Sequence, residues 1–419
     1  MRIALLAFHF RPDEAVGSIR PENWATWLAQ EHEVHVVTRA ANAPDDSGDC
    51  SYRISRTRSL PIRIIEALNA YRKKARSDKA QNPRLAKPQG NDKKTSSGAL
   101  VYRMPCLFDF WLPSAYGELK RIRPDLVIAT HSPYISIVIA LLYCLNNPRT
   151  KLWVDFRDLW VGNHISTGLP LLSKLERYLE KRALNRAEVV STVSQGLQEE
   201  LDKTLGQAKT QLIYNCPARL DKTAAPTPGN SAAPLTLCYT GTINNGWRDP
   251  APLLQLLTTL QRANRIETSA VKFCVASKNP GNLLEIARHL DASEFVDFKG
   301  ALSRQASIDL QLQSDILVLL ESPAPEARGV LTGKIFEYLA TTKPILLIGP
   351  DEHSEIYRIL KKHNRLLTLE EFEQIITGKQ ALPLQQAVDY SEISKNQLLA
   401  SIKALTAPAK GASDCCQTI

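Results

Sequence analysis

The chain has 419 residues, of which 44% are hydrophobic and 23% are charged. This balance excludes a disordered chain and a polytopic membrane protein, and the length favours two domains with hydrophobic cores of their own. The formal net charge of +9 favours a polyanionic partner, which could be nucleic acid, an acidic membrane surface or a phosphorylated substrate. The eight cysteines are scattered, without a C-x-x-C pair or zinc-type histidine spacing, so we expect reduced thiols rather than disulfides or a metal centre.

The first half of the chain alternates apolar runs with helical patterns. Residues 2–8 run directly into polar His9, which indicates a buried strand rather than a signal peptide. The longest apolar stretch, 134–145, is too short to span a bilayer, so we expect a buried helix and no transmembrane segment. Strands are expected at 2–8, 33–38, 125–130, 151–155 and 188–193, and helices at 18–30, 134–147, 170–187 and 194–203.

Between residues 216 and 234, four prolines stand among small residues, which is typical of an interdomain linker. The same alternation then restarts, with strands expected at 235–240, 271–276, 295–298, 315–320 and 344–348, and helices near 249–264, 280–290, 303–312, 332–342 and 352–362.

Apolar strands that alternate with helices predict an α/β fold of two doubly wound, Rossmann-like domains that face a central cleft. Ligands are expected at the carboxyl ends of the strands. We predict an N-terminal domain over 1–215, the linker over 216–234, a C-terminal domain over 235–383, a helix over 384–406 that crosses back to the N-terminal domain, and a flexible tail over 407–419.

Two glycine-containing loops in the C-terminal half could hold phosphate. At residues 332–337, the amides of Thr332 and Gly333 and the charge of Lys334 open a helix, and Glu337 lies on the same face, where it could accept hydrogen bonds from ribose hydroxyls. The alternative is an ordinary helix cap with a solvated glutamate.

The other loop follows the strand that ends near residue 240. Gly241 permits close backbone approach, and Arg248 can make bidentate contacts with a diphosphate. The alternative is a surface arginine on an ordinary strand-to-helix loop.

Three motifs together resemble the bacterial glycosyltransferases of family 4. They are Tyr-Thr-Gly-Thr at 239–242 with Arg-Asp-Pro at 248–250, Asp-Phe-Arg-Asp-Leu-Trp at 155–160, and Thr-Gly-Lys-Ile-Phe-Glu-Tyr-Leu-Ala at 332–340. The resemblance covers about residues 1–390. It implies the two-domain GT-B fold and transfer of a sugar from a nucleotide diphosphate donor with retention, often in the assembly of lipopolysaccharide or other surface polysaccharides.

For the C-terminal domain, the resemblance implies that Glu337 binds the nucleotide ribose and that Arg248, with Lys334 as a second cation, binds the diphosphate. Thr242 stands where the family usually has its first basic residue. Gly329 stands where the family has the first glutamate of its E-x7-E pattern. Contact with the donor sugar would then come from Glu321, Glu326 or the backbone.

For the N-terminal domain, the resemblance assigns Gly17 and Ser18 to the loop near the donor phosphates and the acceptor. His131 resembles the active-site histidine of the family and could hold an acceptor hydroxyl or the donor sugar. The alternative is a structural histidine that bonds to backbone.

Acidic and basic side chains alternate after the strand at 151–155. Asp155, Arg157 and Asp158 could orient an acceptor, or an internal Arg–Asp pair could close the loop. No D-x-D motif with apolar flanks is present, so we expect a reaction without metal, with the nucleotide sugar as co-substrate and no further cofactor.

Most of the excess charge lies in residues 72–94, which carry a net +7, and an aromatic stretch follows at 106–116. A polybasic loop beside aromatic residues favours attachment to an anionic membrane. Nucleic acid is excluded because no recognition motif accompanies the basic run. The alternative is a solvated loop beside a core helix.

The sequence therefore predicts a cytoplasmic hexosyltransferase, peripheral on the inner face of the cytoplasmic membrane, with a nucleotide-sugar donor and a glycan or polyprenyl-linked acceptor. A nucleotide-sugar 2-epimerase of the same fold is an alternative. A non-catalytic nucleotide-sugar-binding or scaffold protein is another, and Gly329 in place of glutamate is the best argument for it.

Overall fold

The computed structural model describes most of the chain and divides it into two compact units. The N-terminal unit comprises the described residues of Met1–Val193 and Leu197–Tyr214 together with 394–406, and the C-terminal unit those of Ser194–Gly196 and Asn215–Ile393. The basic segment 72–94, almost all of the expected linker and the expected tail lie outside the described residues. The structure describes residues 1–13, 16–40, 50–58, 103–162, 169, 171–216, 234–243, 247–278, 280–324, 329–383 and 385–406.

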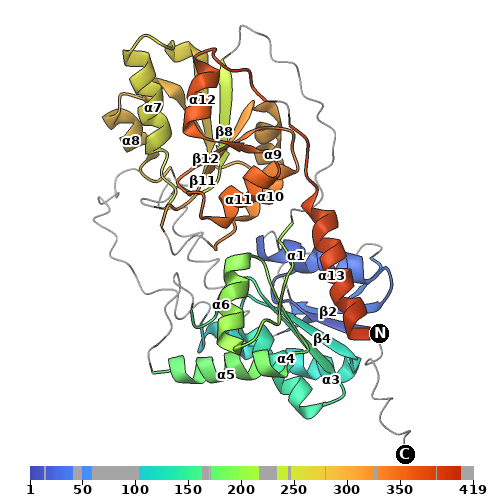
Figure 1. The fold of residues 1–419 in the computed structure, drawn as a ribbon. Coiled ribbons are helices and arrows are strands. Elements are labelled where there is room, and N and C mark those ends of the chain that lie inside the picture. The colour runs from blue at the N-terminus through green and yellow to red at the C-terminus, as the bar shows by residue number, and fades with distance from the viewer. Residues whose placement is uncertain are drawn as a thin grey trace, which may run out of the picture. The chain divides into compact units, whose positions relative to one another are not determined.

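The N-terminal unit is built on a seven-stranded sheet in the order β3-β2-β1-β4-β5-β6-β7 (Figure 1). Every neighbouring pair is parallel. The strands are β1 (Arg2–Leu6), β2 (Glu33–Arg39), β3 (Arg53–Thr57), β4 (Leu126–Thr130), β5 (Lys151–Phe156), β6 (Val189–Thr192) and β7 (Thr210–Leu212).

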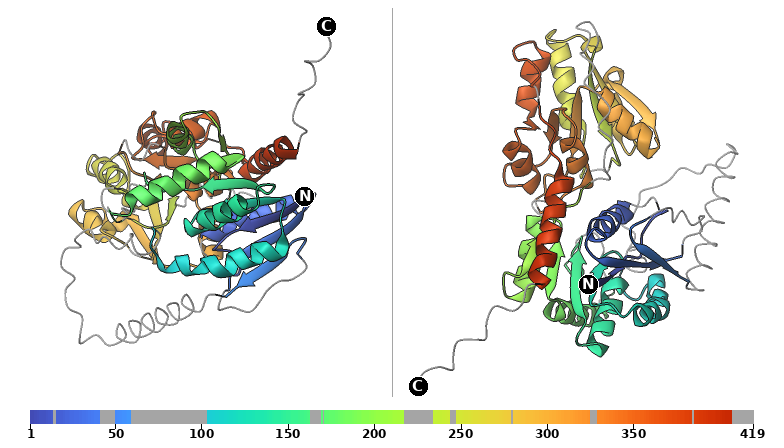
Figure 2. Two further views of the ribbon diagram at one scale, coloured as in Figure 1. Left: turned by 90° about the horizontal axis from the view of Figure 1, so that it is seen from below. Right: turned by 90° about the vertical axis from the view of Figure 1, so that its right-hand side faces the viewer.

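Side chains of this sheet alternate between two hydrophobic clusters, because successive residues of a strand point to opposite faces. On β1, Ala4 and Leu6 belong to the cluster formed with α3 (Leu112–Ile122), α4 (Ile135–Asn146), α5 (Ser173–Arg186) and α6 (Gln195–Leu205). Ile3 and Leu5 belong to the cluster formed with α1 (Val16–Leu28) and α13 (Tyr390–Thr406). Figures 1 and 2 show α1 and α13 together beside the sheet.

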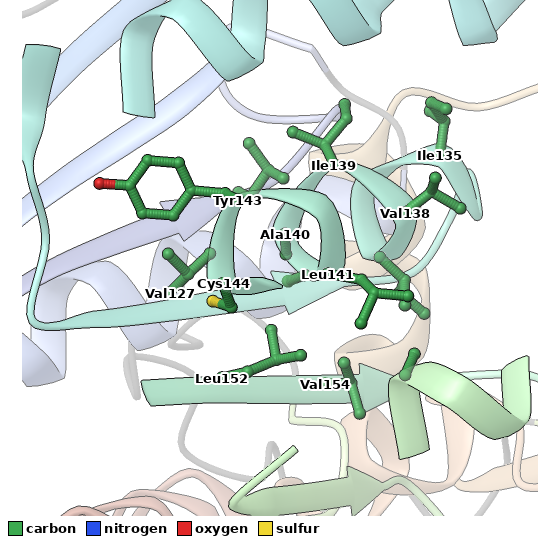
Figure 3. Close-up of a cluster of buried hydrophobic side chains, with 14 of the residues drawn as sticks. Val127, Ile135, Val138, Ile139, Ala140, Leu141, Tyr143, Cys144, Leu152 and Val154 are labelled. Carbon is green, nitrogen blue, oxygen red and sulfur yellow. The ribbon is translucent and has the colours of Figure 1, made fainter. Parts of the chain in front are cut away.

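The apolar stretch near residue 140 forms the buried helix that its composition predicts. Nine of the twelve residues of α4 are buried. In Figure 3, Leu141 and Cys144 of this helix point toward Leu152 and Val154 of β5, whereas Ile139 lies on the other side of the helix within the same hydrophobic cluster. Among the described residues, no helix combines the length and apolarity that a membrane span requires.

The C-terminal unit repeats this plan with a six-stranded parallel sheet in the order β10-β9-β8-β11-β12-β13. Its strands are β8 (Leu235–Thr240), β9 (Val271–Ala276), β10 (Val296–Gly300), β11 (Ile316–Leu320), β12 (Ile345–Ile348) and β13 (Leu366–Leu367). A hydrophobic cluster joins the sheet to α7 (Ala251–Arg262), α8 (Leu283–His289) and α12 (Leu369–Ile376), and the remaining helices are α9 (Arg304–Gln313), α10 (Gly333–Leu339) and α11 (Glu355–Lys362).

Both sheets have the doubly wound order, in which the chain turns back at the first strand. The reversal lies between β1 and β4 in one unit and between β8 and β11 in the other. Such reversals open a crevice outside the carboxyl ends of the strands, where ligands of this architecture bind. The predicted fold class, two doubly wound α/β domains, is confirmed, and each unit has its own candidate ligand edge.

Candidate functional site

In the C-terminal unit, Lys334 lies at the carboxyl end of β8. It belongs to the first turn of α10, and its Nζ is 5.2 Å from the centroid of the Tyr239 ring. A Cβ atom on Gly241 would collide with this Nζ. Glycine at position 241 therefore makes room for the ammonium group.

Arg248 approaches the same edge from the loop before α7. Its Nε donates to Glu321 Oε2 at 3.3 Å, and its Nη1 donates to the hydroxyl of Thr242 at 3.1 Å. Glu321 directly follows β11, and its Oε1 is buried without a hydrogen-bond partner among the described residues. The sequence left Glu321 as one of three possible contacts to the donor sugar, and the structure joins it to Arg248.

The charges at this edge act on one another. Burial, together with the positive charge of Arg248, lowers the pKa of Lys334 to about 8, although the carboxylates of Glu321 and Glu337 oppose this shift. The side chain is therefore mostly an ammonium ion at neutral pH, although it lies near its titration point. A bound polyanion would raise its pKa and keep it charged.

Glu337 lies one turn further along α10. Its Oε1 accepts a hydrogen bond from Arg304 Nη2 at 3.2 Å. Burial raises the pKa of Glu337, while Arg304 and Lys334 counter this shift. Thr332 is the N-cap residue of α10, but its side chain makes no capping hydrogen bond. The structure thus gathers Arg248, Lys334 and Glu337 with the loop residues that the sequence singled out.

In the N-terminal unit, His131 follows β4 at the point where the sheet order reverses. Both of its ring nitrogens are buried and have no partner among the described residues, which speaks against a structural histidine bonded to backbone. Its ring stacks on Tyr134 at 3.9 Å between centroids, and Tyr134 stacks on Trp160 at 4.8 Å. Burial lowers the pKa of His131 well below its usual value, and the charge of Arg157 adds to this, so the imidazole is neutral.

Arg157 joins two of the predicted segments. Its Nη1 donates to the backbone oxygen of Gly17 at 2.9 Å, and its Nε donates to the backbone oxygen of His131. Gly17 and the buried Ser18 lie in the first turn of α1. The residues expected near the acceptor therefore lie together, and Asp158 is exposed beside them.

Asp155 is not accessible to an acceptor, as a residue that orients one would have to be. It is fully buried, and its carboxylate accepts from Arg20 Nε at 2.9 Å and from Arg20 Nη2 at 2.7 Å. The hydroxyls of Thr130 and Ser191 donate to it as well. Burial alone would raise the pKa of Asp155, but these partners hold it below its usual value. Asp155 therefore forms an internal ion pair, and its partner is Arg20 rather than Arg157.

The aromatic stretch at 106–116 mostly serves the core. Trp111 is fully buried, and Phe108 packs against the same cluster, while Phe110 remains 54% exposed. A short 3-10 helix, Leu107–Trp111, leads from here into α3. Of these three aromatic side chains in the stretch expected beside a membrane, only Phe110 is more exposed than buried.

A comparison with protein families finds a match over most of the N-terminal unit. Residues 22–216, just under half of the chain, match the family described as Glycosyltransferase Family 4. Over these residues the chain is similar to the glycosyltransferases of family 4. Arg20 lies just before the matched range, and the candidate residues from His131 to Asp158 lie within it. No curated protein matches the sequence.

Solved structures extend the likeness from residues 22–216 to the whole chain. The lipopolysaccharide outer core galactosyltransferase WaaB is 12% identical with a TM-score of 0.54, covering 97% of this chain and 100% of its own. The sucrose-phosphate synthase of Thermosynechococcus elongatus is 12% identical with a TM-score of 0.55, covering 96% and 97%. A putative UDP-N-acetylglucosamine 2-epimerase from Listeria monocytogenes is 12% identical with a TM-score of 0.50, covering 96% of both chains. These likenesses show the GT-B fold.

Proposed function

We propose that this protein is a retaining, metal-independent glycosyltransferase. It moves a hexose from a nucleotide diphosphate donor onto a glycan or polyprenyl-linked acceptor in the assembly of bacterial surface polysaccharide. The observation that carries this proposal is the placement of two cations, Arg248 and Lys334, at the reversal point of the C-terminal sheet, with Glu337 one turn beyond them. The match to family 4 in the other unit supports the same reaction class.

The donor would be bound by its diphosphate. Arg248 offers a planar guanidinium that suits paired phosphate oxygens, and Lys334 adds a point charge. When the glycosidic bond to the diphosphate breaks, negative charge grows on the leaving oxygens, and these two groups neutralise it. Glu337 accepts hydrogen bonds from the ribose hydroxyls. The cations thereby take over the role that a metal ion has in other sugar transferases.

The acceptor would be bound by the N-terminal unit. Neutral His131 can accept a hydrogen bond from an acceptor hydroxyl at one ring nitrogen and donate one at the other. Arg157 donates to the backbone oxygens of His131 and Gly17, and so holds the segment after β4 beside the start of α1. The reaction belongs to the cytoplasm, on the inner face of the membrane, with residues 72–94 as the predicted anionic-lipid contact.

A donor panel tests the reaction class. The protein is incubated with UDP-, GDP- and dTDP-sugars, with and without a membrane extract that supplies acceptors. We expect labelled sugar to enter the extract's glycans or lipids with one donor. A new free nucleotide sugar formed without extract would identify an epimerase instead, and donor binding without any product would identify a non-catalytic binding protein.

Two substitutions test the site. Arg248→Ala should lower donor hydrolysis roughly 10²–10³-fold, the usual effect of removing one group that stabilises a leaving anion. Glu337→Ala should chiefly raise the KM for the donor. Arg262→Ala is the matched control, because Arg262 pairs with Asp291 on the exposed side of α7. Near-normal turnover in both site variants would contradict the assignment.

A further inference from the structure

The N-terminal unit has a groove of about 870 Å³ that belongs to neither candidate edge. It is formed where α3 and α4 end and where β4 and β5 begin. Because β4 runs from Leu126 to Thr130 before it reaches His131, the groove lies at the opposite end of the sheet from the crevice that holds the imidazole. It is large enough for a ligand the size of a sugar phosphate.

All charged side chains that line the groove are positive. Lys120, Arg123 and Arg149 line it, and no acidic residue does. All three are exposed, and none forms an ion pair among the residues that the structure describes. The nearest carboxylate on α3, Glu118, is already bound to Arg121 at 2.5 Å. An anion in the groove would meet three cations that have no other carboxylate partner in the described part of the chain.

The polar side chains of the groove are held in place. Asn146 Nδ2 donates to the Tyr116 hydroxyl at 3.0 Å, and Asn147 Nδ2 donates to the backbone oxygen of Tyr143 at 2.9 Å. Their amide oxygens therefore remain as acceptors for hydroxyl groups. Figure 3 shows that the hydroxyl of Tyr143 points away from the aliphatic side chains packed around α4. Lys120 Nζ lies 5.1 Å from the centroid of the Tyr116 ring.

We propose that this groove is a second binding site, for a phosphorylated sugar or polyol. The three cations take the phosphate, the asparagine oxygens accept from ligand hydroxyls, and the tyrosine rings form the wall against which the carbon skeleton packs. The phosphate could be that of a free sugar phosphate or of a lipid headgroup, since both present the same chemistry. The site is separate from the proposed donor and acceptor crevices and does not depend on the activity assigned to them.

The test compares ligand binding in two variants of the full-length protein. Lys120→Gln with Arg149→Gln removes two of the three groove cations. Arg121→Gln with Lys203→Gln removes the same charge from exposed ion pairs elsewhere on the N-terminal unit. Glucose 6-phosphate, with glucose as the uncharged control, is titrated calorimetrically. Vesicles of phosphatidylglycerol and phosphatidylcholine, with pure phosphatidylcholine as control, are tested by flotation.

We expect the groove variant to bind glucose 6-phosphate, the anionic vesicles or both about tenfold more weakly or worse, because each charge-assisted hydrogen bond is worth roughly that factor. The control pair should bind as the parent does. Loss in only one arm identifies the source of the phosphate. An Arg248→Gln variant shows how much of the measured binding takes place at the donor edge, because the groove variant leaves that edge intact. Equal binding by the groove variant and the parent in both arms, or no phosphate-dependent binding at all, would overturn the proposal.

Discussion

The two sheets share one strand order, yet they use their charged residues in opposite ways. In the N-terminal unit the central pair, Arg20 and Asp155, is almost fully buried and saturated, and the nearby histidine is neutral. In the C-terminal unit Arg248 pairs with Glu321, whose charge also acts on Lys334, and both cations remain partly accessible. The same topology therefore supplies a rigid, nearly neutral edge in one unit and a cationic edge in the other. Under the proposed function, the neutral edge binds the hydroxyl groups of the acceptor and the cationic edge binds the diphosphate of the donor.

The largest expected effect concerns the buried pair. Asp155→Ala should lower the free energy of unfolding of the N-terminal unit by about 3–5 kcal/mol, because it leaves the Arg20 guanidinium buried without a counter-charge. Chemical denaturation followed by tryptophan fluorescence measures this, since five of the six tryptophans lie in residues 1–215. Asp158→Ala, at the exposed neighbour, should change stability by less than about 0.5 kcal/mol. Equal stability of the two variants would mean that the pair is not the structural element we describe.

The next effect contrasts one glycine in each unit. Gly241→Ala would push against Lys334 Nζ and should lower kcat/KM about 10–10²-fold, since small displacements of a catalytic charge are costly. Gly17→Ala would place its Cβ 3.3 Å from Arg157 Nη2, a contact that a slight shift relieves, so we expect a change of less than about threefold. A larger loss at Gly17 than at Gly241 would reverse the comparison.

The smallest effect is the pH dependence of the cationic edge. With a pKa of about 8, Lys334 is mostly charged at pH 7 and mostly neutral at pH 9, so kcat/KM should fall about tenfold between these two pH values. Lys334→Arg should abolish this decline, because a guanidinium stays charged. The pH profile of the free enzyme with limiting donor measures it. An unchanged decline in the arginine variant would assign the titration to another group.

The sequence predicted the fold well where strands are apolar and central. The alternation of apolar runs with helical patterns located β1, β2, β4 to β6 and the central strands of the other unit within a few residues. It missed β3, β7 and β13, because Arg53–Thr57 is mostly polar and partly exposed, and the other two have only three and two residues. Edge strands of this kind carry no continuous hydrophobic signal.

The site was predictable where a residue follows directly after a strand or opens a helix, as Gly241, Lys334 and His131 do. The ion-pair partner of Asp155 could not be predicted, because Arg20 lies 135 residues away in sequence and no local spacing connects them. Glu321 was one of several upstream glutamates, and its hydrogen bond to Arg248 could be found only once β8 and β11 were neighbours. Long-range pairing is the information that local patterns lack.

The position of α13 at the end of the described chain affects the order in which the two units can fold during synthesis. Leu398 and Ile402 of α13 belong to the same hydrophobic cluster as Trp24 and Trp153, so this one of the two clusters on the N-terminal sheet is complete only when α13 has been made. The C-terminal unit, apart from Ser194–Gly196, is continuous from Asn215 to Ile393. On the ribosome it can therefore fold first, although it is translated second. A nascent chain that stops before residue 394 leaves an apolar stripe of the first sheet open to chaperones and proteases.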